Sequence, residues 1–138
     1  MKFLCLVFLC AISVCLADHV RTKDDLASYR QECATENGLT AEELEKVKKG
    51  EVTNDEKTRC YVRCVSKKFE MFEDDKGVNV EKSLRQLEHA NKDLTADTLR
   101  EKVLKCVDAT KDKKGDNCVW AFAAHACFKQ EKLKLVQE

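Results

Sequence analysis

Residues 118–128 read CVWAFAAHACF, and this stretch decides the fold. It contains no Asp, Glu, Lys or Arg. Drawn as a helix, it carries apolar side chains on nearly every side, whereas a surface helix carries them on one stripe. We therefore expect a central, buried helix over residues 116–129.

Two cysteines in this stretch indicate how the helix is held. Cys118 and Cys127 are nine residues apart, which is about 13.5 Å along a helix, and a disulfide spans at most about 7 Å between Cα atoms. Nine steps of about 100° place the two side chains on opposite sides of the helix. We expect the helix to be fixed from two directions by disulfides to other segments.

Five further helices are predicted around the central one. Thr22, Thr40 and Thr53 each precede a carboxylate by three residues, which is typical of a helix start with a capping box. All four glycines lie between apolar periodic segments, and the absence of proline disfavours a sheet of many short strands. The sequence therefore predicts an all-α chain with one domain of six helices. The further helices are expected at 24–36, 41–49, 54–71, 80–90 and 96–109.

The N-terminal residues indicate the compartment. An uncharged stretch of residues 3–17 follows Lys2 and ends in Cys-Leu-Ala. It is shorter than the roughly 20 residues of a membrane span, and its pattern is typical of a secretory signal peptide. We predict a signal peptide over 1–17 and a secreted, extracellular helical domain over 18–138. The alternative is an N-terminal membrane anchor.

Six of the nine cysteines follow residue 17, and an even number in a secreted chain indicates three disulfides. Cys60 and Cys64 face the same side of one helix, so each is expected to bond to another helix. Excluding this pair and Cys118–Cys127 leaves ten of the fifteen possible pairings open. A zinc site is disfavoured because no second short Cys/His pair matches Cys60 and Cys64. We predict no metal and no other cofactor.

The remaining composition disfavours several functions. The chain has 25 basic and 25 acidic residues, whereas a nucleic-acid binder usually carries a basic excess. Its serines and histidines do not lie in a nucleophile elbow, a phosphate-binding loop or a metalloprotease helix motif. We interpret His125 as a core histidine or a polar group in a pocket wall rather than as a catalytic base. The chain is predicted to be no enzyme and to bind neither nucleic acid nor, by stable insertion, a membrane.

The cysteine spacing is specific enough to suggest a family. It reads Cys33-x26-Cys60-x3-Cys64-x41-Cys106-x11-Cys118-x8-Cys127. Together with six helices behind a signal peptide, this pattern resembles the six-cysteine subclass of insect odorant-binding proteins, which includes the pheromone-binding and general odorant-binding proteins. The resemblance implies a six-helix, disulfide-linked domain that encloses an apolar cavity. It also implies the disulfides Cys33–Cys64, Cys60–Cys118 and Cys106–Cys127.

The resemblance further implies a secreted carrier of small hydrophobic ligands, such as odorants, pheromones or fatty-acid-like molecules. It allows a chemosensory receptor as a second partner. The expected cavity wall consists of apolar residues from the third to the sixth helix, with small alanines that leave room; the alternative is that they form a solid core. The expected wall residues are Val65, Phe69, Phe72, Leu84, Leu87, Val103, Val107, Val119, Trp120, Phe122, Ala123 and Phe128.

A second group of functions is compatible with the same fold. The chain could be a humoral, seminal or salivary protein that acts through a surface partner or sequesters a hormone or an amine. An amine binder should place a carboxylate beside aromatic residues in its cavity, and residues 117–128 contain no acid.

The tail, FKQEKLKLVQE at residues 128–138, combines Leu133, Leu135 and Val136 with three lysines. Some pheromone-binding relatives fill the cavity with a longer apolar tail in acid. Burying an unpaired lysine costs several kcal/mol, more than three aliphatic side chains readily offset once ordering entropy is included. We expect this tail to form a partial lid over the cavity mouth and not an internal plug.

Overall fold

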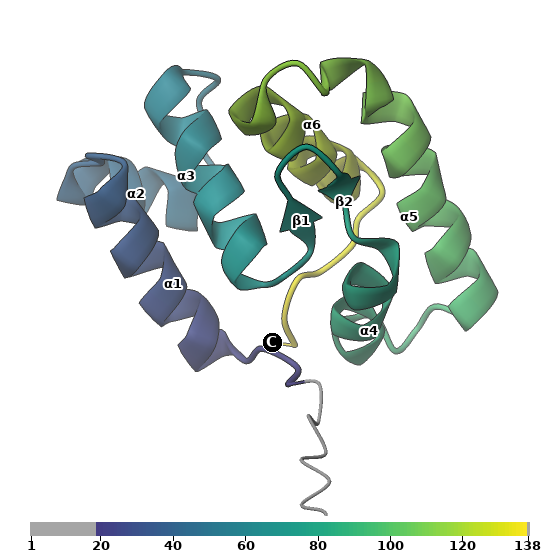
Figure 1. The fold of residues 1–138 in the computed structure, drawn as a ribbon. Helices are drawn as coiled ribbons and strands as arrows, with labels where there is room; N and C mark the ends of the chain where they lie inside the picture. The colour runs from purple at the N-terminus through teal and green to yellow at the C-terminus, as the bar shows by residue number, and fades with distance from the viewer. Residues whose placement is uncertain (1–18, 138) are drawn as a thin grey trace, which may run out of the picture.

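The computed structural model describes residues 19–137. The predicted signal peptide lies outside these residues. The described part contains six α-helices, one short 3₁₀ helix and one two-stranded hairpin (Figure 1), which confirms the all-α class. The helices are α1 (Lys23–Glu36), α2 (Ala41–Lys48), α3 (Glu56–Lys68), α4 (Val80–Ala90), α5 (Ala96–Thr110) and α6 (Asn117–Gln130), with η1 at Lys111–Lys113. No helix within residues 19–137 is long and apolar enough to cross a membrane.

Two of the three predicted helix starts are confirmed. Thr22 and Thr40 each accept a hydrogen bond from the amide three residues on, and the carboxylate there accepts one from the threonine backbone. The third prediction is wrong, because Asp55 caps α3 and accepts from the amide of Thr58 at 2.9 Å. Thr53 instead donates its hydroxyl proton to Asp55. An aspartate carboxylate caps a helix at least as well as a threonine hydroxyl.

Helix α3 is shorter than predicted at both ends, and a hairpin follows it. Glu70 has a φ of 57°, and Met71 N–H donates to the carbonyl of Ser66 at 3.0 Å. This left-handed residue ends the helix and turns the chain into β1 (Phe72–Glu73) and β2 (Gly77–Val78). Strands of two residues are too short to give an alternating pattern, so the sequence did not reveal them.

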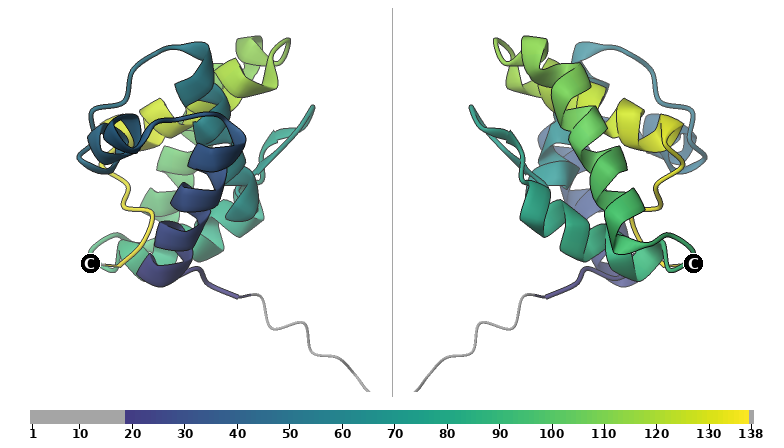
Figure 2. Two further views of the ribbon diagram at one scale, coloured as in Figure 1. Left: turned by 90° about the vertical axis from the view of Figure 1, so that its left-hand side faces the viewer. Right: turned by 90° about the vertical axis from the view of Figure 1, so that its right-hand side faces the viewer.

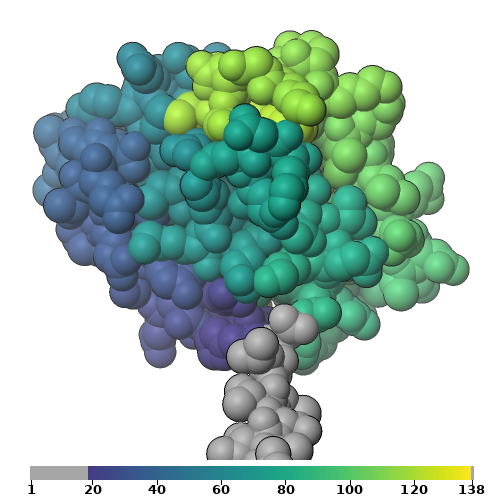
Figure 3. All heavy atoms as spheres, in the orientation of Figure 1, coloured from purple at the N-terminus to yellow at the C-terminus, as the bar shows by residue number. Residues whose placement is uncertain are grey.

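Ion pairs fix the hairpin turn to α3. Arg63 Nε donates to Asp74 at 2.7 Å, and Lys67 also binds this carboxylate. The hydrogen bonds from Arg63 and Lys67 and their charges lower the pKa of Asp74 to about 2. The hairpin and the C-terminal segment lie on opposite sides of the molecule (Figure 2). In the space-filling view the hairpin covers the centre of its face (Figure 3).

Helix α6 is the centre of the packing, as predicted, and contacts α3, α5, η1 and β2. The disulfide Cys60–Cys118 joins it to α3, and Cys106–Cys127 joins it to α5. The third disulfide, Cys33–Cys64, joins α1 to α3. These are the three pairs that the resemblance implies. Their Cα–Cα distances are 4.6, 5.5 and 5.7 Å respectively, within the usual range for disulfides.

A small aromatic cluster joins α6 to the hairpin. Phe72 and Trp120 pack edge to face with ring centroids 5.7 Å apart, and Ala121 completes the cluster. Gly77 in β2 has a φ of 84°. A Cβ atom at residue 77 would lie 2.3 Å from Cζ2 of Trp120. The close approach of the strand to the indole ring therefore requires glycine.

Gly77→Ala is expected to lower the free energy of unfolding by about 2–5 kcal/mol, because backbone strain and overpacking each cost about 1–3 kcal/mol. Gly38→Ala is the matched control: its φ is 67°, but no heavy atom lies within 4 Å of the added Cβ. It should lose only the strain, about 1–2 kcal/mol. Urea denaturation measures both, and equal losses would contradict the role assigned to Trp120.

Candidate functional site

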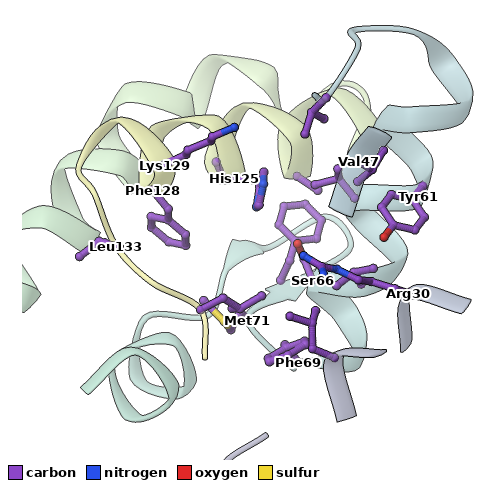
Figure 4. A pocket seen from close by; sticks show the side chains of 18 of the residues that line it. Arg30, Val47, Tyr61, Ser66, Phe69, Met71, His125, Phe128, Lys129 and Leu133 are labelled. Carbon is purple, nitrogen blue, oxygen red and sulfur yellow. The ribbon is translucent and has the colours of Figure 1, made fainter. Parts of the chain in front are cut away.

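A pocket of about 240 Å³ lies between α1, α3, α6, the hairpin and the C-terminal segment (Figure 4). The loop after α2 closes one edge through Gly50 and Val52, and Leu87 of α4 contributes to the wall. Segments that are far apart in the sequence thus meet around one space. Its shape depends on how the helices are held together.

Most of the wall is apolar. Helix α3 contributes Val62 and Val65, and Phe69 follows just beyond its last residue. Their spacing of three and four residues places these side chains on one stripe of the helix. Met71 and Phe128 extend the surface, and Figure 4 shows both at the pocket with Phe69. The residues 62, 65, 69 and 71 are at most 9% exposed.

Helix α6 turns one stripe toward the pocket. Ala121, Ala124, His125 and Phe128 line it, at the i, i+3, i+4 and i+7 positions of one helix face. Because α6 is apolar on nearly all sides, periodicity did not show which face this would be. The small alanines leave space that larger side chains would fill.

Five of the twelve expected wall residues line the pocket, namely Val65, Phe69, Phe72, Leu87 and Phe128. The other seven lie elsewhere. Val103 and Val107 are on α5, which packs against α4 and the other side of α6. Trp120 packs in the hairpin cluster. The remaining four are Leu84, Val119, Phe122 and Ala123, which are partly buried outside this pocket. Which wall residues bind a ligand stays a prediction.

Polar residues also reach the pocket. Arg30 of α1, Tyr61 and Ser66 of α3, and His125 of α6 line it, and Figure 4 shows them approaching from three helices. The expected wall omitted Arg30 and Tyr61. A signal for Arg30 was present in the sequence, because it lies on the same stripe of α1 as the buried residues Leu26 and Cys33.

His125 lines the pocket as one of the two environments considered for it. Burial lowers its pKa below the ordinary value of 6.5, and the positive charges of Lys129 and Arg30 lower it further. The imidazole is therefore neutral at pH 7. Within residues 19–137 the ring makes no hydrogen bond to another side chain or to the backbone.

The C-terminal segment forms part of the wall. Lys132, with a φ of 59°, ends the turn after α6, and the chain runs back past α4 (Figures 1 and 2). Leu133 and Leu135 line the pocket, whereas Lys134 between them is exposed. Val136 packs against the core outside the pocket. The alternation keeps the lysine charges in water while the leucines cover the cavity.

Two buried amide side chains of α4 and its end hold this segment. Gln86 Nε2 donates to the carbonyl of Leu135 at 2.9 Å. Asn91 Nδ2 donates to the carbonyl of Lys134 at 2.9 Å, and Lys134 N–H donates back to Asn91 Oδ1 at 2.9 Å. Both amides are about 4% exposed. The backbone of the tail is thus paired although its sequence is irregular.

Comparison with known proteins agrees with the cysteine pattern. The sequence profile of the PBP/GOBP family matches residues 17–131. The chain is 38% identical over 118 residues to "Odorant-binding protein 22" of Aedes aegypti, covering 86% of this chain and 82% of that protein. It is 34% identical over 141 residues to "General odorant-binding protein 99b" of Drosophila melanogaster, covering 96% and 94%.

The fold also resembles solved structures. The crystal structure of odorant-binding protein 22a of Anopheles gambiae superimposes with a TM-score of 0.61 at 21% identity, over 75% of this chain and 95% of that chain. A structure of the same mosquito protein described as in the open status for ligand binding gives a TM-score of 0.62, over 76% and 89%. These likenesses support the six-helix fold.

The lowered pKa of His125 predicts a pH dependence of stability. Below pH 6.5 the unfolded chain takes up this proton before the folded protein does, so the free energy of unfolding falls as the pH falls. The loss should start near pH 6.5 and continue to the lower, folded-state pKa. His125→Gln should remove this step, whereas the exposed His89→Gln should keep it. Chemical denaturation between pH 8 and pH 5 measures the effect, and an identical pH profile for wild type and His125→Gln would contradict it.

Asn91→Ala is expected to loosen the C-terminal segment. It removes two hydrogen bonds to Lys134, each worth about 0.5–1.5 kcal/mol, so exchange of the Lys134 amide should accelerate about tenfold or more. Asn37→Ala is the control, because Asn37 Nδ2 bonds the carbonyl of Cys33 in the same i−4 manner without touching the tail. Hydrogen–deuterium exchange of residues 132–137 should change only in the first variant.

Proposed function

The chain belongs to the PBP/GOBP family, and we propose that it is a secreted carrier that binds small hydrophobic molecules in the pocket between α1, α3 and α6. The observation that carries the proposal is the pocket itself, which has a largely apolar wall built from distant segments. Ligand sites are typically concave and apolar, with a few polar groups that orient the ligand. The names of the relatives, which are odorant-binding proteins, support the same function.

The pocket volume limits the ligand. About 240 Å³ is below the roughly 300–1,000 Å³ typical of pockets for drug-sized molecules. A single flexible chain or a small ring compound fits this space better than a large polycyclic ligand. The proposed ligand is therefore a small, mainly apolar molecule.

The disulfides support a carrier because a hollow core weakens a small domain. An unfilled apolar cavity loses the contacts that its lining atoms would otherwise make. Each disulfide can contribute about 2–4 kcal/mol by restricting the unfolded chain. Three of them, spanning sequence separations of 21, 31 and 58 residues, allow the shell to keep its shape without a solid interior.

The chemistry of the wall disfavours an amine ligand. Among the described residues that line the pocket there is no Asp or Glu, whereas Arg30, Lys48 and Lys129 are cationic. An ammonium group would enter this pocket without a counter-ion, which is costly. A catalytic function is not part of the proposal, and a function through a surface partner is the alternative that the following experiment tests.

Ala124→Leu should abolish binding of a neutral fluorescent hydrophobic dye, because residue 124 lines the pocket and is 3% exposed. The added side chain fills space that the ligand would occupy. Ala109→Leu, at an exposed position of α5, adds the same atoms outside the pocket and should bind as the wild type does. Circular dichroism and the thermal midpoint confirm that both variants fold.

Two outcomes would contradict the carrier function. The dye could fail to bind the wild type and remain undisplaced across a panel of volatile compounds and fatty acids. Alternatively, Ala124→Leu could fold and bind with wild-type affinity. Either result would favour a function through the protein surface.

A further inference from the structure

One end of the pocket carries positive charge that no acid neutralises. Arg30, Lys48 and Lys129 contribute to its lining. Lys48 Nζ binds Glu45 at 2.7 Å, and Lys129 Nζ donates to the carbonyl of Gly50 at 2.9 Å. No carboxylate within residues 19–137 lies within ion-pair distance of Arg30. An arginine in an apolar pocket without a carboxylate partner is unusual, because a desolvated charge is costly unless it is paired.

Tyr61 presents an unpaired hydroxyl in the same region. The residue is 2% exposed, and its hydroxyl has no hydrogen-bond partner among the described residues. Leaving a buried hydroxyl unpaired costs about 1–3 kcal/mol, so such a group calls for an explanation. Burial raises the pKa of Tyr61, and the charge of Arg30 opposes the rise. Arg30 and Tyr61 are therefore close together, although no hydrogen bond of good geometry joins them.

His125 supplies a third unpaired polar group on the α6 side. Its ring lines the pocket (Figure 4), and the charge of Arg30 reaches it strongly enough to lower its pKa. A neutral imidazole carries one N–H donor. Arg30, Tyr61 and His125, called the donor cluster below, thus bring donors from α1, α3 and α6 to one end of an otherwise apolar space.

We propose that the donor cluster binds the carboxylate of an amphipathic ligand, whose apolar chain lies along Val65, Phe69 and Phe128. This inference rests on the proposed carrier function and names the ligand class. A guanidinium forms two parallel hydrogen bonds with a carboxylate, and charge-assisted hydrogen bonds are roughly twice as strong as neutral ones. The Tyr61 hydroxyl can donate to the same carboxylate and so gains the partner that it lacks.

The charge of the cluster favours a carboxylate over a phosphate monoester. With His125 neutral, the cluster carries the single positive charge of Arg30, which one carboxylate neutralises. A phosphate monoester carries about −1.5 to −2 charges near neutral pH and would leave part of its charge unpaired in an apolar pocket. The ligand class is therefore a monocarboxylic acid with one apolar chain.

The test compares head groups on one chain length. Dodecanoic acid, its methyl ester and dodecanol compete at neutral pH against a neutral fluorescent hydrophobic dye. The wild type is expected to bind the acid about tenfold or more tightly than the ester, because a hydrogen bond to a charged group is worth about 1.5–3 kcal/mol. The alcohol should behave as the ester does.

Variants assign the effect to the donor cluster. Arg30→Met keeps the apolar stem and should weaken acid binding by about ten- to a hundredfold, with little change for the ester. Arg30→Lys keeps the charge without the paired hydrogen bonds and should give an intermediate affinity. Tyr61→Phe removes one hydroxyl and should weaken only acid binding, by about three- to tenfold. Arg100→Met removes an exposed cation on α5 and should leave all affinities unchanged.

The outcomes separate this inference from the carrier function. If the dye and the ester bind but the acid has no advantage, or if Arg30→Met weakens acid and ester equally, the carboxylate site is wrong and the carrier function stands. If neither the dye nor any of the three competitors binds the wild type, both proposals fail. Circular dichroism of each variant shows that a lost affinity is not a lost fold.

Discussion

The rest of the structure depends on the two-sided attachment of α6. Cys60–Cys118 fixes one side of this helix to α3, and Cys106–Cys127 fixes the opposite side to α5. A helix that is apolar all round could rotate among several packings of similar energy, because no polar face specifies its orientation. The two disulfides remove this freedom. They decide that Ala121, Ala124 and Phe128 face the pocket while Trp120 faces the hairpin.

A pocket that excludes water changes the value of each polar group within it. On the outer surface, ion pairs such as Lys46–Glu42 join exposed side chains and contribute little. Arg30 and Tyr61 instead lie where an unpaired donor is costly and a partner is correspondingly favourable. The same low polarity that attracts an apolar chain therefore makes the pocket selective for the charge of the group at its end.

The two edges of the pocket are closed by irregular segments that use different chemistry. The hairpin is held by charges, through Arg63 and Lys67 on Asp74. The C-terminal segment is held by the neutral amides of Gln86 and Asn91, which pair its backbone in a buried environment. Neutral amides can be buried without the desolvation cost of ions. The tail can therefore lie directly against the pocket, whereas the charged turn stays at the rim.

The sequence by itself determined what depends on neighbouring residues. It specified the six helices, the starts at Thr22 and Thr40, and the central place of α6, because caps and apolar periodicity act within a few residues. The cysteine spacing added the disulfides through the family pattern. Tertiary structure alone decided the face that α6 turns to the pocket and the exclusion of Val103 and Val107 from it. It also decided the meeting of Arg30 with Tyr61 and His125. These features depend on contacts between segments 31 or more residues apart, and no local pattern encodes the rotation of one packed helix against another.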